Sequence, residues 1–269
     1  MRAFKSIVIG SVTALLIGGC GSGTVSGRPP ASPSPSAPSS TRDRAHVDSS
    51  KAAGELAGRA AASKDHHYRA TYRYDRGRGK AVDVTVAVAA DGAWQVEVPG
   101  GARGGKVDVT IAHDRNGYFQ CATVKRRTCV AVTGSAGKLP ASIDPVVEHV
   151  FTDWMDHLLN RRVPVSVTYA DRLPGADAKS RCYWLETNSV TVSSPVPPGT
   201  YCLRPDGLIT AAKSDFGTLR LDGEPEPGPS TLKLPGDVAD SDPLPTKAPP
   251  KPKPKPSKSP TAKPTKRKP

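Results

Sequence analysis

Three side chains have the types and spacing of a metal site or an acid–base pair. His149, Asp153 and His157 stand four residues apart within residues 142–162, where a helix is predicted, so their side chains would share one helix face. The same helical geometry places them opposite an apolar stripe that contains Trp154. We therefore expect a solvated helix face and no metal site.

Two other motifs approach a nucleotide-binding or catalytic pattern but lack essential parts. The segment GGARGGKV (100–107) has the glycine and lysine spacing of a phosphate-binding loop. However, Val107 stands where that loop needs Ser or Thr, and a strand is predicted to follow instead of a helix. Ser135 in VTGSAG lacks the G-x-S-x-G arrangement of a nucleophile elbow. We therefore predict a hairpin turn at 100–107 and a protein that is not an enzyme and needs no cofactor.

Four cysteines of the central region are predicted to form disulfides. Cys121, Cys129, Cys182 and Cys202 are an even number, and they allow three pairings. The sequential pairing, Cys121–Cys129 and Cys182–Cys202, is favoured because each pair would join neighbouring strands. Zinc is the competing partner of such a set, but neither a C-x-x-C spacing nor a histidine ligand accompanies the four residues. The fifth cysteine, Cys20, stands apart near the N-terminus.

The N-terminal residues resemble a bacterial lipoprotein signal. Arg2 and Lys5 precede the mostly apolar run 6–17, which is shorter than the roughly 20 residues of a membrane-spanning helix but suits a secretory signal. The residues LLIGGC that end the run resemble a lipobox, in which the cysteine is acylated after cleavage. The resemblance implies that residues 1–19 are removed and that Cys20 anchors the protein at the extracytoplasmic face of the cell membrane. An ordinary secretory signal with an unmodified cysteine is the alternative.

Composition divides the rest of the chain of 269 residues into three parts. Residues 20–45 are rich in Gly, Ser and Pro and predict a linker, residues 46–235 predict one folded domain, and residues 236–269 predict a disordered tail rich in Pro and Lys. Much of the formal net charge of +13 belongs to the tail, because residues 244–269 hold nine Lys or Arg and no acid. No basic face for nucleic acid is therefore expected on the domain. The tail is expected to attract an anionic cell-wall polymer or to act as a spacer.

The folded domain is predicted to be α+β. Residues 49–64 favour a short N-terminal helix, and residues 142–162 favour one long amphipathic helix. Elsewhere apolar and polar residues alternate, as in AVDVTVAVAADGAWQVEVPG (81–100). This alternation predicts an antiparallel meander with one buried face.

The order of these elements is similar to that of the LolA/LppX-like lipid carriers and of lipoproteins from high-GC Gram-positive bacteria. The resemblance rests on the lipobox, the linker, ADGAWQVEVPGG (90–101), the amphipathic helix and GTYCLRPDGLITAAKS (199–214). It implies a curved antiparallel sheet that wraps helices as a half-open barrel, with a cavity that binds an envelope lipid or glycolipid. Eight residues would line the cavity: Val84, Val86, Trp94, Val96, Val109, Ile111, Phe151 and Trp154. The alternative is a non-catalytic scaffold lipoprotein that binds a cell-wall polymer or a protein.

Overall fold

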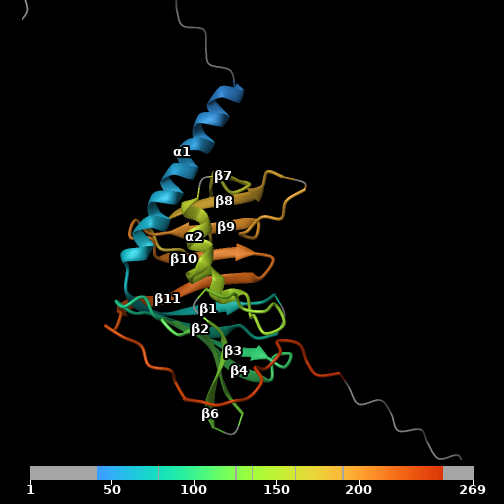
Figure 1. Cartoon of the computed structure of the whole chain (residues 1–269). Helices are drawn as coiled ribbons and strands as arrows, with labels where there is room; N and C mark the ends of the chain where they lie inside the picture. The colour runs from blue at the N-terminus through green and yellow to red at the C-terminus, as the bar shows by residue number, and fades with distance from the viewer. Residues whose placement is uncertain are drawn as a thin grey trace, which may run out of the picture. The chain divides into compact units, whose positions relative to one another are not determined.

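The computed structural model describes residues 41–250, except residues 78, 125, 135, 161 and 190 and the side chains of residues 41–47. The predicted signal, Cys20, most of the linker, Ser135 and the end of the basic tail lie outside the described residues. The described part forms one sheet of twelve strands together with two α-helices (Figure 1). In this part of the chain no helix combines the length and the apolar character needed to cross a membrane.

The strands form two antiparallel meanders that follow chain order. The first consists of β1 (Tyr68–Asp75), β2 (Val82–Val88), β3 (Trp94–Ala102), β4 (Val107–Asp114), β5 (Gly117–Thr123) and β6 (Arg127–Thr133). The second consists of β7 (Val165–Ala170), β8 (Arg181–Thr187), β9 (Gly199–Leu203), β10 (Ile209–Ser214) and β11 (Gly217–Pro227). The two meanders join into one sheet because β11 pairs with β1. A short last strand, β12 (Asp237–Val238), pairs in parallel with β6. The strand order is β12-β6-β5-β4-β3-β2-β1-β11-β10-β9-β8-β7.

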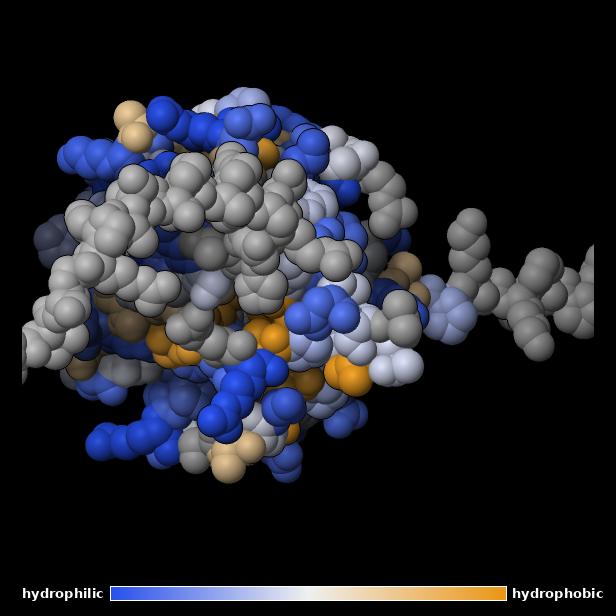
Figure 2. Space-filling view, turned by 90° about the horizontal axis from the view of Figure 1, so that it is seen from above, coloured by the Kyte–Doolittle hydropathy of each residue, from blue (hydrophilic) through white to orange (hydrophobic). Residues whose placement is uncertain are grey.

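The burial of side chains follows the alternation seen in the sequence. In β1, Tyr72 and Tyr74 are buried and Arg69 is exposed, as expected for a strand with one face on a core. Seen from above, apolar residues (orange) show between hydrophilic ones (blue) (Figure 2). The segment 100–107 contains the predicted hairpin turn at residues 103–106, since Ala102 of β3 pairs with Val107 of β4. Its central residues have left-handed φ angles, which include 92° at Gly105.

The helices differ in length from the prediction. The N-terminal helix α1 (Thr41–Ala62) is the long one, with 22 residues, and the 3₁₀ turn η1 (Ser63–Asp65) follows it. The segment predicted as one long helix instead contains the five-residue 3₁₀ turn η2 (Val147–Phe151) and the seven-residue α2 (Asp153–Leu159). The α+β open sheet is therefore confirmed, whereas the prediction of one long amphipathic helix at residues 142–162 is wrong.

Two local breaks explain why residues 142–162 do not form a single helix. The Asp144 carboxylate accepts a hydrogen bond of 2.6 Å from the N–H of Val146, whose φ of 70° lies in the left-handed region. Between η2 and α2, Thr152 has φ −125° and ψ −110°, and its hydroxyl donates to the carbonyl of Glu148. Both residues therefore have backbone angles that an α-helix does not allow.

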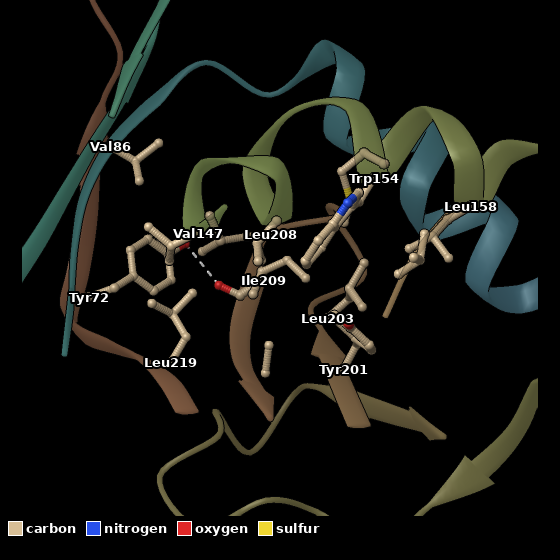
Figure 3. Packing of buried hydrophobic residues seen from close by; sticks show 14 of the residues in the cluster. Tyr72, Val86, Val147, Trp154, Leu158, Tyr201, Leu203, Leu208, Ile209 and Leu219 are labelled. Carbon is tan, nitrogen blue, oxygen red and sulfur yellow. Dashed lines mark hydrogen bonds between the residues drawn. The ribbon is translucent and has the colours of Figure 1, made fainter. Parts of the chain in front are cut away.

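The core lies between the sheet and the helical layer. In Figure 1, α2 lies across β8–β10, and α1 lies beside α2 and β7. Buried side chains from both layers pack together in Figure 3: Tyr72, Val86, Val147, Trp154, Leu158, Tyr201, Leu203, Leu208, Ile209 and Leu219. The Tyr72 hydroxyl donates a hydrogen bond of 2.9 Å to the carbonyl of Ile209, so this buried polar group is satisfied.

Both predicted disulfides are confirmed. Cys121–Cys129 joins β5 to β6, and Cys182–Cys202 joins β8 to β9. Each pair occupies directly opposite positions on neighbouring antiparallel strands, with the Cα atoms 3.9 Å apart. All four bridged cysteines are buried. The bridges therefore tie together strands that already pair.

A C-terminal strap, which we define as residues 228–247, packs on the first meander (Figure 1, orange to red). The backbone N–H of Ala90 donates to the carbonyl of Pro229 at 3.0 Å. Further along, the side-chain amide of Gln120 and the backbone of Leu244 exchange two hydrogen bonds of 2.9 and 2.6 Å. The packed region thus continues beyond residue 235, where the sequence predicts the folded domain to end.

Ending the chain after residue 235 should lower the free energy of unfolding by about 1–3 kcal/mol, because the buried Gln120 side chain would lose its hydrogen-bond partner, Leu244. Ending the chain after residue 250 should leave the free energy of unfolding unchanged, because the strap is then complete. Urea unfolding of the two truncated chains beside the full chain measures both effects. Equal unfolding midpoints for all three chains would contradict a stabilising role of the strap.

Candidate functional site

A cleft opens between the turn that joins β2 to β3 and the helical layer. It has a volume of about 450 Å³, within the roughly 300–1,000 Å³ of small-molecule sites. Apolar side chains that line it include Trp94, Phe151, Met155, Leu208 and Ile209. The cleft exists because η1, η2 and the start of α2 meet the ends of these strands without filling the space between them.

The mouth of the cleft is polar. Lys64 and Asp156 form an ion pair, and their side chains are 43% and 60% exposed. His66 and His67 line the same cleft; His66 is half-buried and His67 is exposed. A lining that combines apolar side chains with charged and polar ones suits a ligand that has an apolar chain and a polar head.

The eight residues predicted to line a cavity fall into two groups. Trp94 and Phe151 line the cleft. The other six are buried: Val84, Val86, Val96, Val109, Ile111 and Trp154, of which all except Ile111 belong to the main core cluster. Side chains therefore fill much of the space between sheet and helices. The open part lies at one end of the β2–β3 hairpin.

Several residues of the cleft were missed by the sequence analysis. Lys64 and His66 reach it from the end of the α1–η1 segment, and Leu208 reaches it from the turn before β10. Gly207 makes the close approach of this turn to α1 possible, because a Cβ at its φ of 84° would lie 2.3 Å from the carbonyl oxygen of Arg59. These contacts join segments far apart in the chain, so local periodicity carries no signal of them.

A second polar feature, the acid–histidine cluster, consists of Asp144, Glu148, His149 and Asp153. His149 Nδ1 lies 2.6 Å from Asp153 Oδ1, and its Nε2 lies 2.8 Å from Asp144 Oδ2 and 3.9 Å from Glu148 Oε1. Burial alone would lower the pKa of His149, but the hydrogen bonds to Asp144 and Asp153 raise it to about 10. His149 is therefore an imidazolium that donates from both ring nitrogens.

The predicted solvated helix face is wrong for His149. Its side chain is only 22% exposed and stacks on Trp154, with the ring centroids 5.8 Å apart. The break at Thr152 removes the continuous helix on which the prediction relied. His157 is half-buried and does not belong to the cluster.

Glu148 is the most unusual member of the cluster. Its side chain is completely buried, and within the described part of the chain neither carboxylate oxygen has a hydrogen-bond partner. Burial raises the pKa of Glu148 well above its ordinary value, and the neighbouring Asp144 raises it further. Burial would also raise the pKa of Asp144, but the hydrogen bond from His149 holds it below its usual range. A buried carboxyl group without a partner costs free energy.

Comparisons with known proteins assign no family to the chain. A scan against protein-family models found no match, and a search of curated proteins also found none. The open sheet, the cleft and the acid–histidine cluster are therefore the features from which a function can be inferred.

Proposed function

We propose that this protein is a lipoprotein, anchored through Cys20 to the extracytoplasmic face of the cell membrane, that binds a lipid or glycolipid in the cleft. The observation that carries the proposal is the combination of apolar and charged side chains that line a cleft of about 450 Å³. A second supporting feature is the open sheet with helices packed against it, as expected for a relative of the LolA/LppX-like carriers.

The cleft favours a ligand with a single acyl chain. Trp94, Phe151 and Met155 offer apolar surface to such a chain. Each methylene removed from water contributes about 0.8 kcal/mol, so ten methylenes would contribute about 8 kcal/mol before the entropic cost of binding. The head group would then lie near Lys64 and Asp156, where polar groups and water can satisfy it.

The proposed location rests on the N-terminal sequence and the cysteines. LLIGGC has the pattern of a lipobox, and a Gly/Ser/Pro-rich segment follows it. The two disulfides favour an oxidising compartment, because thiols are kept reduced in the cytosol. Acylated Cys20 would hold the domain at the membrane, and the linker after it would set how far from the membrane the domain can lie.

Replacing Cys20 with alanine should abolish the lipid anchor. The Cys20→Ala chain should accumulate as an uncleaved precursor or as a released product without lipid, whereas Ser22→Ala should behave like the unchanged protein. Fractionation of cells and the intact mass of the membrane-bound protein measure these outcomes. A membrane-bound protein whose Cys20 carries no acyl group would contradict the proposed anchor.

Filling the cleft should weaken lipid binding at least about tenfold, equivalent to about 1.4 kcal/mol. Ala90 is exposed and lines the cleft, so Ala90→Trp introduces a bulky side chain there without disturbing the core. Ala141→Trp, at an exposed turn residue outside the lining, is the matched control. Titration with dansyl-undecanoic acid measures the affinities. Equal binding by both variants would contradict the assignment of the cleft.

A further inference from the structure

Ligand atoms from three members of the acid–histidine cluster lie close together. Asp144, Glu148 and His149 each contribute one oxygen or nitrogen, and these atoms lie within 4.8 Å of one another. Ligands bound to zinc at about 2.0–2.2 Å in a tetrahedral arrangement stand roughly 3.5 Å apart. Small side-chain movements would therefore bring all three atoms to one ion.

Glu148 supplies an independent indication of a cation. A surface group of acids needs no ion, because water solvates it. Glu148, by contrast, is 0% exposed, and both of its oxygens lack a hydrogen-bond partner among the described residues. Buried polar groups are usually satisfied, and an exception calls for a missing partner such as an ion. A positive ion between Glu148 and Asp144 would supply that partner.

Asp153 lies where it can orient the ring of His149. Its Oδ1 lies 2.6 Å from Nδ1 of His149 and thus fixes the ring by accepting the Nδ1–H bond. Histidines that bind metals through one ring nitrogen typically donate from the other nitrogen to a carboxylate or a carbonyl. This arrangement leaves Nε2, which faces Asp144 and Glu148, as the ligand atom.

We propose that Asp144, Glu148 and His149 bind a divalent transition-metal ion, and that Zn²⁺ is the ion they fit best. One imidazole nitrogen and two carboxylate oxygens are ligands that zinc accepts readily, whereas Ca²⁺ and Mg²⁺ prefer sites made of oxygen alone. On binding, the ion takes the place of the Nε2 proton of His149, which passes to solvent.

Three protein ligands leave a coordination position for water or for an anionic group. A cavity of about 100 Å³, lined by Glu148, His149, Asp153 and Lys138, adjoins the proposed site and has room for such a group. This cavity shares Trp94, Tyr118, Thr152 and Asp153 with the cleft that is proposed to bind lipid. The metal proposal nevertheless stands without lipid binding, because it depends only on the cluster.

The full chain, stripped with a chelator and titrated with ZnCl₂ by calorimetry, tests the proposal. We expect one zinc ion per chain by elemental analysis, and a visible absorption spectrum when Co²⁺ replaces zinc. Glu148→Gln should abolish this site, and Asp153→Asn should weaken it about 10–100-fold, as loss of an orienting partner does elsewhere. Asp171→Asn is the matched control, since this exposed acid lies outside the cluster and outside the cleft, and it should keep the affinity of the unchanged chain.

Circular dichroism checks the folding of each variant. If Glu148→Gln does not fold, the zinc affinity of Asp153→Asn tests the proposal instead. An unchanged chain that binds no zinc would overturn the proposal. Zinc that binds to Glu148→Gln as tightly as to the unchanged chain would also overturn it, because Glu148 would then not be a ligand. If only Asp153→Asn folds, an unchanged affinity in that variant would overturn it, because His149, which Asp153 orients, would then not be a ligand. Neither result depends on whether the cleft binds lipid, so the two proposals can fail separately.

Discussion

Replacing His149 with glutamine should lower the free energy of unfolding by about 3 kcal/mol at neutral pH, in the range expected when one partner of a buried ion pair is removed. The imidazolium lies between Asp144 and Asp153 and close to the buried Glu148. Without it, Asp144 and Asp153 lose their hydrogen-bond donor, and the cluster loses its positive charge. Urea unfolding with a chelator present measures the loss, and His157→Gln is the control because His157 lies outside the cluster.

The pH dependence of this loss follows from the direction of the pKa shift. The pKa of His149 is raised from 6.5 to about 10 on folding, so the folded chain holds the proton more tightly than the unfolded chain. The contribution of His149 is fully present below pH 6.5 and is lost as the pH rises towards 10. The difference between the unchanged chain and His149→Gln should therefore shrink over this interval. A difference that grows with pH, or an equal loss in His157→Gln, would contradict the role assigned to His149.

Removing the Cys182–Cys202 disulfide should lower the free energy of unfolding by about 3 kcal/mol, because the bridge restricts a loop of the unfolded chain. The sequence separation is 20 residues here and 8 residues for Cys121–Cys129. The same entropic relation therefore gives the shorter loop a smaller contribution of about 2.5 kcal/mol. Cys182→Ala/Cys202→Ala and Cys121→Ala/Cys129→Ala should both unfold at lower urea concentration than the unchanged chain.

Reduction of the unchanged chain is the control for the cysteine variants, because it opens the bridges without altering side-chain volume by substitution. It should lower stability at least as much as the larger of the two double substitutions. Unfolding midpoints that do not move on reduction would show that the disulfides contribute little. Such a result would also weaken the inference that the domain works in an oxidising compartment.

The sheet could be predicted from the sequence because strand signals are local. Val84 and Val86 alternate with polar residues, and both are buried in β2. The sequential disulfide pairing followed from the same meander, since Cys121 and Cys129 come from strands joined by a short turn. What the local pattern could not show is that β11 returns to pair with β1 and so joins the two meanders.

The helical layer and the site were less predictable, because individual contacts, and no repeating sequence pattern, determine where the helices end and which side chains meet. The apolar period of residues 142–162 fits a helix, but the Asp144 carboxylate and the left-handed Val146 interrupt it. Burial of Glu148 depends on how η2 packs on the sheet, and no spacing in the sequence indicates it. The cleft likewise depends on contacts between distant segments.

The most direct test of the proposed function is native mass spectrometry of the unchanged full chain produced in a bacterial envelope. The proposal predicts a bound lipid of defined mass, separate from the covalent anchor, that is lost on delipidation and taken up again from phospholipid or glycolipid vesicles. Ala90→Trp should carry less of it, and Ala141→Trp should carry as much as the unchanged chain. A chain that carries only its covalent anchor and takes up neither lipid would contradict lipid binding and favour a scaffold that binds its partner through the surface.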